Sequence, residues 1–306
     1  MFHPWLIMTL TLVLSTSCSR RASRVETAID RQILHMANGD EPQGIDPHVV
    51  TGIPENNILG SILEGLVSED PKDLHPVPGV AERWEVSKDG KTYTFFLREN
   101  AEWSNGDPVT ASDFLRSYQR MLTPTLAAQY AYMLYVVENA EAFNTGKIKD
   151  FSKVGFKVID DRTLQILLEN ATPYFLSLIN HYSWFPVHIP TVLEFGELDE
   201  RGTRWTRPGN FVGNGPFRLK SWKLNQVLIV EKSPTYWDRE TVRLNEIHFY
   251  PITSEDAEER AFRSGQIHLT YDMPLSKIPY YQENKPELLR IDTWLGNYFY
   301  RLHLFN

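Results

Sequence analysis

The chain of 306 residues contains a single cysteine, Cys18, so no disulfide can form within it and its fold depends on a hydrophobic core. Beyond the N-terminus there is no run of about 18 or more apolar residues, which excludes an internal membrane-spanning helix. Basic residues are not in excess either, because 31 Lys and Arg are outnumbered by 39 Asp and Glu and are scattered along the chain. The net charge of −8 argues against a nucleic-acid partner.

Internal repeats of roughly 20 to 50 residues are absent, and so are low-complexity tracts. Hydrophobic residues make up 42% of the chain and aromatic residues 12%, a composition typical of a globular protein. A chain of this length can bury a substantial core and form two domains or one large one.

The N-terminus reads MFHPWLIMTLTLVLSTSCSR, and its apolar segment is too short to span a bilayer. The segment has the length of the core of a secretory signal, so we predict a signal peptide over residues 1–17 and export to the periplasm or cell surface. Cys18 follows three small residues in an arrangement that resembles a bacterial lipobox, although Ser15 stands where that motif usually has Leu. We expect a lipid anchor on Cys18, the alternative being a plain signal peptide with an incidental cysteine. The polar residues 18–32 would form a tether.

Hydrophobic periodicity predicts a mixture of strands and helices. Alternating apolar residues favour a strand beginning at Ile33 and one at 91–100, which the turn signal at 87–90 makes part of a hairpin. Further strands are expected in hairpins or singly at 153–170, 213–237, 243–252 and after 264. Helical spacing favours helices at 56–66, 111–122, 127–143 and 255–264. Hairpins that alternate with single helices indicate an α/β fold of the mixed α+β kind with mixed sheets, not a doubly wound parallel sheet.

The stretch AEWSNGDPVTASDFLRSYQRML at 101–122 places two carboxylates, Asp107 and Asp113, where they could form an acid/base pair. The favoured interpretation is structural: Asp107 closes an Asn-Gly turn, and Asp113 pairs with Thr110 as a capping box for a helix that begins at Ala111. The stretch supplies no nucleophile, no metal ligand set and no phosphate cradle. We therefore predict that the protein is not an enzyme and carries no cofactor or metal.

The stretch LRENAEWSNGDPVTASDFLRSYQRML resembles the signature of the family 5 solute-binding proteins, the extracytoplasmic receptors of bacterial ABC importers for oligopeptides, dipeptides and related solutes. Further segments resemble the same family in order and at similar spacing, and the resemblance runs from about Ile33 to Tyr300. These segments are IDPHVVTGIPENNILGSILEGLVSED, HPVPGVAERWEVSKDGKTYTFFLR, FKVIDDRTLQILLENATPYF, GNGPFRLKSW, VEKSPTYWD and RSGQIHLTYDMP.

The resemblance implies a type II periplasmic-binding-protein architecture with a discontinuous domain I at 33–65 and 184–290 and a domain II inserted at 66–183. Residues 291–306 correspond to the start of the crossover into a third domain. Because members of the family continue well beyond this point, we expect a C-terminally truncated chain that holds domains I and II only. In the family the ligand lies between domains I and III, so we expect this chain to hold it weakly.

The resemblance also implies the ligand-binding residues. Thr51, Gly52 and Ile53 match the strand segment that hydrogen-bonds an extended peptide, with Thr51 where the oligopeptide binders carry Glu. The tyrosine that packs beside the peptide matches Tyr130, with Tyr132 and Tyr135 as alternatives, and two further aromatics at the crossover match Tyr298 and Tyr300. The expected partners are a peptide, the permease subunits of an ABC importer and a membrane reached by the lipid anchor alone, and the expected state is a monomer.

Two alternatives stay open. The same fold could bind another solute, such as a dipeptide, a nickel complex, heme, an oligosaccharide or a signalling peptide; five histidines could suggest metal, but they lack tight ligand spacing. These histidines are His35, His48, His181, His188 and His248. The other alternative is a degenerate surface lipoprotein with no role in transport.

Overall fold

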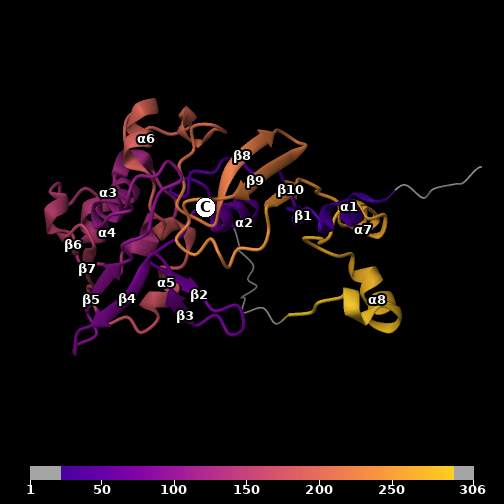
Figure 1. Cartoon of the computed structure of the whole chain (residues 1–306). Coiled ribbons are helices and arrows are strands. Elements are labelled where there is room, and N and C mark those ends of the chain that lie inside the picture. Colours follow the sequence, from indigo (N-terminus) through magenta and orange to yellow (C-terminus); the bar gives the residue numbers. More distant parts are fainter. Residues whose placement is uncertain (1–21, 293–306) are drawn as a thin grey trace, which may run out of the picture.

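The computed structural model describes residues 22–292, which form three β-sheets with helices between and around them (Figure 1). The strands are β1 (Ile33–Ala37), β2 (Val67–Glu69), β3 (Pro76–Pro78), β4 (Ala81–Val86), β5 (Thr92–Leu97), β6 (Phe156–Asp160), β7 (Thr163–Leu167), β8 (Phe217–Lys223), β9 (Val227–Lys232) and β10 (Glu246–Tyr250). The helices are α1 (Arg24–Ile29), α2 (Ile53–Ile62), α3 (Ala111–Leu122), α4 (Ala140–Asn144), α5 (Phe175–Leu178), α6 (Ile189–Phe195), α7 (Glu255–Arg263) and α8 (Ile278–Asn284).

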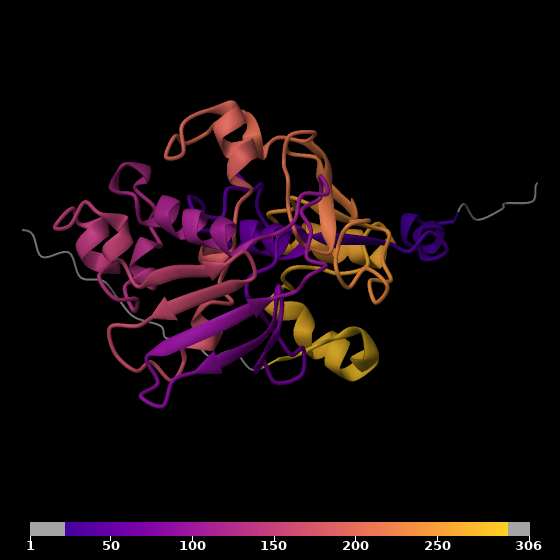
Figure 2. The same ribbon diagram turned by 60° about the vertical axis from the view of Figure 1, so that its left-hand side comes forward.

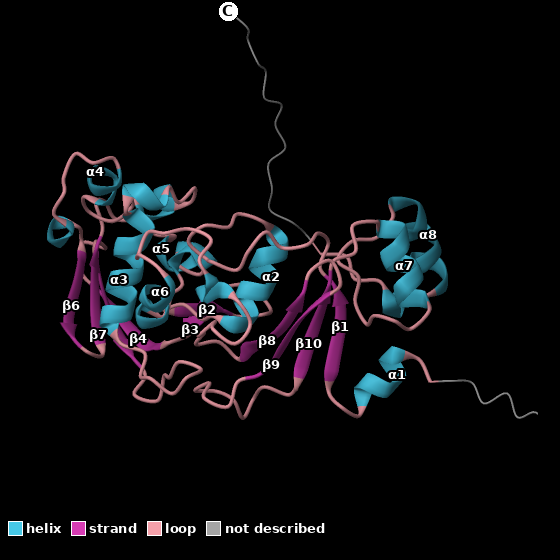
Figure 3. Ribbon diagram, turned by 90° about the horizontal axis from the view of Figure 1, so that it is seen from above, coloured by secondary structure: helices cyan, strands magenta, loops and turns pink. Residues whose placement is uncertain are grey.

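Two four-stranded sheets dominate the fold, and a two-stranded sheet of β2 and β3 accompanies them. The order β1-β10-β9-β8 combines one parallel pair, β1 with β10, and antiparallel neighbours, so the predicted mixed sheet is confirmed. The other sheet, β4-β5-β7-β6, is antiparallel throughout. Figure 3 shows the two sheets toward opposite ends of the molecule with α2 between them. The strands of the first sheet come from the ranges 33–65 and 184–290, and those of the second from 66–183.

The predicted hairpins are confirmed. β4 and β5 join through the turn before Lys91, β6 pairs with β7, and β8 pairs with β9. Gly90 and Asn225 adopt positive φ angles of 70° and 55° in their turns, which suits Gly and Asn better than other residues. Alternate residues of β5 are buried, as expected for a strand with one face on the core.

The stretch at 101–122 folds as its sequence predicts. Helix α3 begins at Ala111, and the backbone N–H of Thr110 donates to the Asp113 carboxylate at 2.8 Å. The hydroxyl of Thr110 donates to the same carboxylate at 2.9 Å. The apolar face of the helix is fully buried, and Figure 2 shows α3 along one face of the β4–β7 sheet. The buried face consists of Phe114, Tyr118, Met121 and Leu122.

Tyr118 connects the two parts of the fold. Its ring lies 4.7 Å from that of Phe156 in β6 and 5.3 Å from that of Trp184. Aromatic pairs at such separations add attraction to the area that they bury. A single apolar core therefore extends from the β4–β7 sheet to α2 and the β1–β10 sheet. In residues 22–292 no helix has the length and apolar character needed to cross a membrane.

Helix α2 differs from the predicted 56–66. It begins at Ile53, because Gly52 is an extended N-cap and Pro54 occupies the first turn, where proline costs no hydrogen bond. It ends at Ile62, whose carbonyl oxygen accepts from the N–H of Gly215 at 3.1 Å. A Cβ atom at Gly215 would lie 2.5 Å from the Ile62 carbonyl carbon, so the crossing chain needs glycine there.

Three other predictions of local structure were wrong. Residues 127–143 do not form one helix, because Ala127 and Asn139 adopt left-handed backbone and leave a 3-10 helix at Ala131–Leu134 followed by α4. The range 18–32, predicted to be a tether, contains α1, whose capping box joins Ser23 and Glu26. The strand expected after 264 is reduced to a bridge between Met36 and Leu269.

Candidate functional site

The segment Thr51–Ile53 connects the loop after β1 to α2. It was predicted to be a strand, but Thr51 and Gly52 pair with no strand in the described part of the chain, and Ile53 already belongs to α2. Gly52 is extended, with φ −90° and ψ 158°. The prediction of a strand was wrong because glycine followed by a proline in the first turn favours the entry to a helix over a sheet ladder.

The backbone N–H groups of this segment are free. Among residues 22–292, no carbonyl or side chain accepts from the N–H of Thr51, Gly52 or Ile53. Thr51 is exposed, and the side chain of Ile53 is 48% exposed. The first N–H groups of any helix lack an intrahelical acceptor, and an extended residue before the cap prolongs that row. The segment therefore offers consecutive donors to an external acceptor.

A buried carboxylate holds the segment in place. Glu55 is 3% exposed, and its Oε1 accepts from the backbone N–H of Gln43 at 2.6 Å. A Cβ atom on Gly52 would lie 2.0 Å from Oε2 of Glu55, so the carboxylate fits only because residue 52 is glycine. On the other side, Asn38 donates to the carbonyl of Pro54 at 3.1 Å. The loop and the first turn of α2 are thus held from both sides.

Aromatic side chains hold the carbonyl groups that precede the segment. The Tyr130 hydroxyl donates to the Thr51 carbonyl, and the Tyr182 hydroxyl donates to the Val50 carbonyl, each at 3.2 Å. The His181 ring lies between them, edge-on to Tyr130 at 5.0 Å and stacked on Tyr182 at 4.2 Å. Burial lowers the pKa of His181 to about 4 and raises the pKa of Tyr182. The cluster is therefore uncharged at neutral pH.

Of the three candidate tyrosines, Tyr130 alone reaches the segment. Tyr132 is 58% exposed and its ring lies 6.1 Å from that of Tyr130. The hydroxyl of Tyr135 donates to Asn144 at 2.6 Å. His181 was missed as part of this site, because a single histidine gives no spacing pattern. Tyr298, Tyr300 and Cys18 lie outside the described residues.

An open hollow of about 280 Å³ adjoins the segment beyond Ile53. Its floor is shaped by Glu258, which accepts from the backbone N–H groups of Tyr271 and Asp272 at 2.9 Å each. Burial raises the pKa of this carboxyl group. The ring of Tyr271 packs over Gly39, where a Cβ atom would lie 3.5 Å from the ring. Of the lining residues only Ile53 was predicted; the lining consists of Gly39, Asp40, Ile53, Pro54, Ile252, Thr253, Glu255, Glu258, Tyr271 and Asp272.

A buried ion pair supports the loop that leads into the segment. Both oxygens of Asp46 accept from the Arg120 guanidinium, at 2.9 and 2.6 Å. Burial by itself would raise the pKa of Asp46, but the charge and hydrogen bonds of Arg120 outweigh it and lower that pKa. The same guanidinium donates to His48 Nδ1 at 2.9 Å, so Nε2 carries the proton that His48 donates to the Phe185 carbonyl at 3.1 Å.

Comparison with known proteins places the chain in a family. A family model described as "Bacterial extracellular solute-binding proteins, family 5 Middle" matches residues 75–304. The chain belongs to the family 5 solute-binding proteins. The resemblance in its motifs is thereby confirmed, and the mixed α/β fold is the one that solved family members share.

Among curated relatives, the periplasmic oligopeptide-binding protein OppA of Salmonella typhimurium is 40% identical over 277 residues, covering 90% of this chain and 49% of the relative. Dipeptide-binding protein DppE of Bacillus subtilis is 40% identical over 276 residues, covering 89% of this chain and 48% of the relative. The solved complex of Haemophilus influenzae OppA with the peptide RPPGFSPFR gives a TM-score of 0.78 at 36% identity, covering 85% of this chain and 48% of that one. The chain spans about half the length of the curated relatives it matches.

In this family 5 chain, the carboxylates at 101–122 serve local structure. Asp113 caps α3, and Asp107 accepts from Asn105 within the turn at 2.6 Å and from His188 Nε2 at 3.1 Å. Family 5 relatives are solute-binding proteins rather than enzymes. Both carboxylates therefore have structural partners, as the favoured interpretation predicted.

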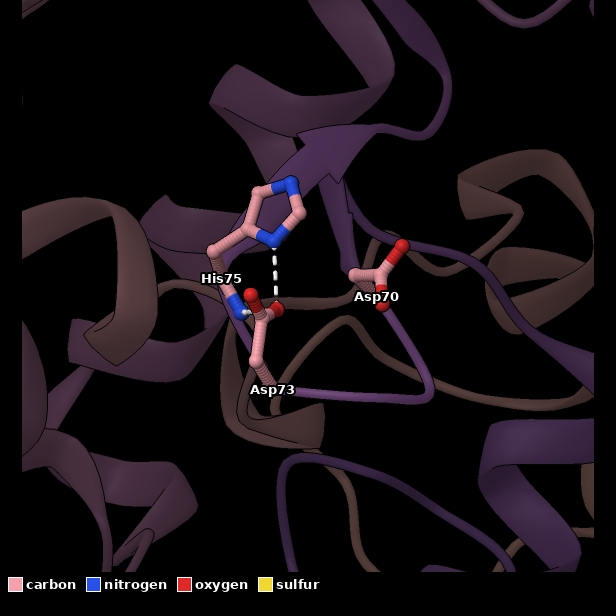
Figure 4. Close-up of side chains that lie close together, drawn as sticks. All are labelled: Asp70, Asp73 and His75. Carbon is pink, nitrogen blue, oxygen red and sulfur yellow. Dashed lines mark hydrogen bonds and ion pairs between the residues drawn. The ribbon is translucent and has the colours of Figure 1, made fainter.

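One cluster in the described residues brings possible metal ligands together, in the turn between β2 and β3 (Figure 4). The ligand atoms of Asp70, Asp73 and His75 lie within 4.8 Å of one another. Asp73 and the His75 ring are hydrogen-bonded at 2.5 Å, and Asp70 accepts from the backbone N–H of Lys72 at 2.8 Å. These bonds shape the exposed turn, so the cluster has a structural explanation that needs no ion.

Proposed function

We propose that this chain is the extracytoplasmic solute-binding component of an ABC importer and that it holds an oligopeptide in extended form. The observation that carries the proposal is the row of free N–H groups at Thr51, Gly52 and Ile53. A peptide backbone laid alongside would accept from those of the N–H groups that point toward it, as a strand does when it adds to a sheet edge and bonds alternate residues. The names of the relatives, oligopeptide-binding and dipeptide-binding, support a peptide as the ligand.

The neighbouring side chains suit such a ligand. Tyr130 and His181 form an uncharged aromatic wall next to the Thr51 carbonyl, where the apolar parts of peptide side chains can pack. The exposed Ile53 side chain and the hollow beyond it extend this surface. Recognition through the backbone leaves side-chain choice loose, because every residue of a peptide carries the same carbonyl group.

The affinity that the backbone donors alone can provide is low. Each hydrogen bond contributes about 0.5–1.5 kcal/mol net, so two contribute roughly 1–3 kcal/mol, compared with about 4.1 kcal/mol for a dissociation constant of 1 mM. Packing on the aromatic wall adds to this. We therefore expect binding near the millimolar range, consistent with the weak binding predicted from the sequence.

The remaining parts of the proposal concern location and partners. The predicted signal peptide at 1–17 would direct export, and lipid on Cys18 would anchor the chain outside the cytoplasm. The periplasmic relatives support an extracytoplasmic location. The chain would act as a monomer that delivers peptide to permease subunits. Its domain I would comprise 33–65 and 184–290, and its domain II 66–183.

A proline at position 53 tests the backbone donors. Ile53 is the first residue of α2, where proline is well tolerated and the missing N–H breaks no helix bond. Gly52 is already extended, as a residue before proline prefers. Ile53→Ala is the matched control, because it removes the side chain and keeps the N–H. Isothermal titration with tri- to pentapeptides should show affinity about 2- to 13-fold lower for Ile53→Pro than for Ile53→Ala.

Equal affinities of these two variants would contradict recognition through the N–H groups. The alternatives from the sequence give other results in the same titration. Another solute in the same fold would bind where peptides do not, and a surface lipoprotein without a transport role would bind neither.

A further inference from the structure

A second cavity, of about 220 Å³, has Thr51 in its lining. It is smaller than the roughly 300–1,000 Å³ of typical ligand pockets, so it has room for one side chain or one chain terminus, not for a whole peptide. Because Thr51 lines the cavity, a ligand bound beside residues 51–53 would lie next to the opening of the cavity. The lining residues are Gln43, Gly44, Ile45, Asp46, Val49, Val50, Thr51, Gln129, Arg201, Gly202, Trp205, Thr206, Arg207 and Trp222.

Two arginines in the lining have no anionic partner. Among the described residues, the guanidinium of Arg201 makes no hydrogen bond, ion pair or ring contact. That of Arg207 contacts the Trp222 ring, 5.8 Å from its centroid, and no carboxylate. The one acid in the lining, Asp46, is neutralised by Arg120. The cavity therefore has an excess of positive charge.

The nearby acids outside the lining are engaged elsewhere. Glu41 accepts from the indole N–H of Trp222 at 2.7 Å and from the N–H of Asn225 at 3.0 Å. Asp199 accepts from the hydroxyl of Thr125, and Glu200 accepts from the N–H of Glu197 at 3.2 Å. None of these carboxylates contacts the guanidinium groups of the cavity.

Arg120 makes the cavity a built feature of the fold. Its guanidinium binds Asp46 on one wall, and its Nε donates at 2.7 Å to the carbonyl of Leu198, which lies in the loop between α6 and Arg201. The same guanidinium lies 5.8 Å from the ring centroid of Trp205, which is 2% exposed. One buried side chain thus joins both walls, and Arg201 and Arg207 are exposed in the lining.

We propose that this cavity is a subsite for a carboxylate of the peptide bound along Thr51–Ile53. The inference rests on the proposed function and specifies its ligand as a peptide with a carboxylate near that segment. A guanidinium binds a carboxylate through two parallel hydrogen bonds, which gives both affinity and orientation. The carboxylate comes either from an acidic side chain or from the C-terminus of the peptide, and the experiment separates these sources.

The test uses four peptides and three forms of the full chain. The peptides are Ala-Glu-Ala and Ala-Gln-Ala, each with a free or an amidated C-terminus. The variant is R201Q/R207Q, and the control is R116Q/R243Q, which removes the same charge from two exposed arginines without side-chain partners elsewhere on the surface. Isothermal titration at low salt should show a preference for the carboxylate-bearing peptide of about 10- to 100-fold, the range expected of charge-assisted hydrogen bonds.

The preference should disappear in R201Q/R207Q and persist in R116Q/R243Q. A preference of Glu over Gln identifies the side chain as the source, and one of free over amidated peptide identifies the C-terminus. The subsite is overturned if the parent chain shows neither preference. It is also overturned if R201Q/R207Q keeps the preference of the parent, or if R116Q/R243Q loses that preference to the same extent.

If no peptide binds at all, the proposed function fails, and a titration with the dicarboxylate glutarate tests the subsite independently. The indole N–H resonance of Trp222, assigned with Trp222→Phe, should then move on addition of glutarate to the parent and stay still in R201Q/R207Q. Absence of movement in the parent would overturn the subsite as well.

Discussion

The hydroxyl of Tyr130 donates a hydrogen bond to the backbone carbonyl of Thr51 at 3.2 Å, across 79 residues of sequence. This bond joins the range 66–183 to the loop that precedes α2. It orients the peptide plane between Thr51 and Gly52, because the carbonyl of Thr51 and the N–H of Gly52 belong to one planar unit. When the carbonyl points at Tyr130, the N–H points the opposite way. The tyrosine therefore positions a backbone donor of the proposed peptide site.

Tyr130→Phe should weaken peptide binding with little effect on stability. The variant keeps the ring beside His181 and loses the hydrogen bond, so the donor at Gly52 is less well held. We expect affinity to fall by about 2- to 13-fold, corresponding to about 0.5–1.5 kcal/mol. Titration calorimetry with a tripeptide measures it. Tyr132→Phe is the control, since its hydroxyl has no partner among the described residues, and an equal loss there would refute the positioning role.

Gly52→Ala and Gly60→Ala should change stability in opposite directions. A Cβ at Gly52 would meet the buried Glu55 carboxylate at 2.0 Å, so we expect destabilisation of about 1–3 kcal/mol. Gly60 lies in α2 with nothing within 4 Å of its Cβ position, so alanine should stabilise by about 0.5–1 kcal/mol. Urea unfolding followed by tryptophan fluorescence measures both. Changes of the same sign would contradict this account of Gly52.

Arg120→Met should be strongly destabilising. It leaves the buried Asp46 carboxylate without its partner and frees the Leu198 carbonyl, and breaking a buried pair in this way costs about 3–5 kcal/mol. Arg116 lies one turn earlier in α3 and is exposed, so Arg116→Met should stay within about 0.5 kcal/mol of the parent. Equilibrium unfolding in urea compares the two. Similar losses would show that the ion pair is not the cause.

Stability should fall as pH decreases from 6.5 toward 4. Burial and the neighbouring Arg120 guanidinium lower the pKa of His48 from 6.5 to about 4 in the folded chain. The unfolded chain therefore binds a proton in this window that the folded chain does not, and His48 contributes a slope of about 1.4 kcal/mol per pH unit. The lowered pKa of Asp46 acts separately, because the stability from its ion pair is present above pH 3.8 and is lost at more acidic pH.

His48→Gln should reduce that slope, whatever it does to stability at neutral pH. The measurement is the free energy of unfolding at several values between pH 4 and 6.5. His75→Gln is the control, because that exposed ring has a pKa raised by its hydrogen bond to Asp73 and gives no such slope. An unchanged slope in His48→Gln would mean that His48 is protonated in the folded chain.

Local patterns in the sequence predicted local structure well. The capping residues before α3 predicted where the helix begins, and the alternation in β5 predicted which of its residues face the core. Both patterns depend on neighbours a few positions apart. The predicted helix at 127–143 failed, because apolar spacing does not reveal that Ala127 and Asn139 leave the helical region. Tertiary packing imposes those angles.

The candidate site was only partly predictable for the same reason. Thr51, Gly52, Ile53 and Tyr130 were identified by resemblance, and the structure brings them together. His181 and Tyr271 joined them through folding, with no spacing signal of their own. The Arg120–Asp46 pair joins residues 74 positions apart in the sequence. Arg201 and Arg207 lack a carboxylate partner because the nearby acids bind other groups, and this depends on the folded structure. Such information exists only once the chain has folded.

The parallel pairing of β1 with β10 also determines when the first sheet can close during synthesis. Ile33 pairs with Glu246, so β1 emerges from the ribosome 213 residues before its partner. At about 5–20 residues per second this delay is roughly 10 to 40 s. The strands at 81–167 lie entirely within that interval and can complete their sheet first. Until β10 arrives, β1 has no strand partner and its backbone groups are open to pairing with other chains.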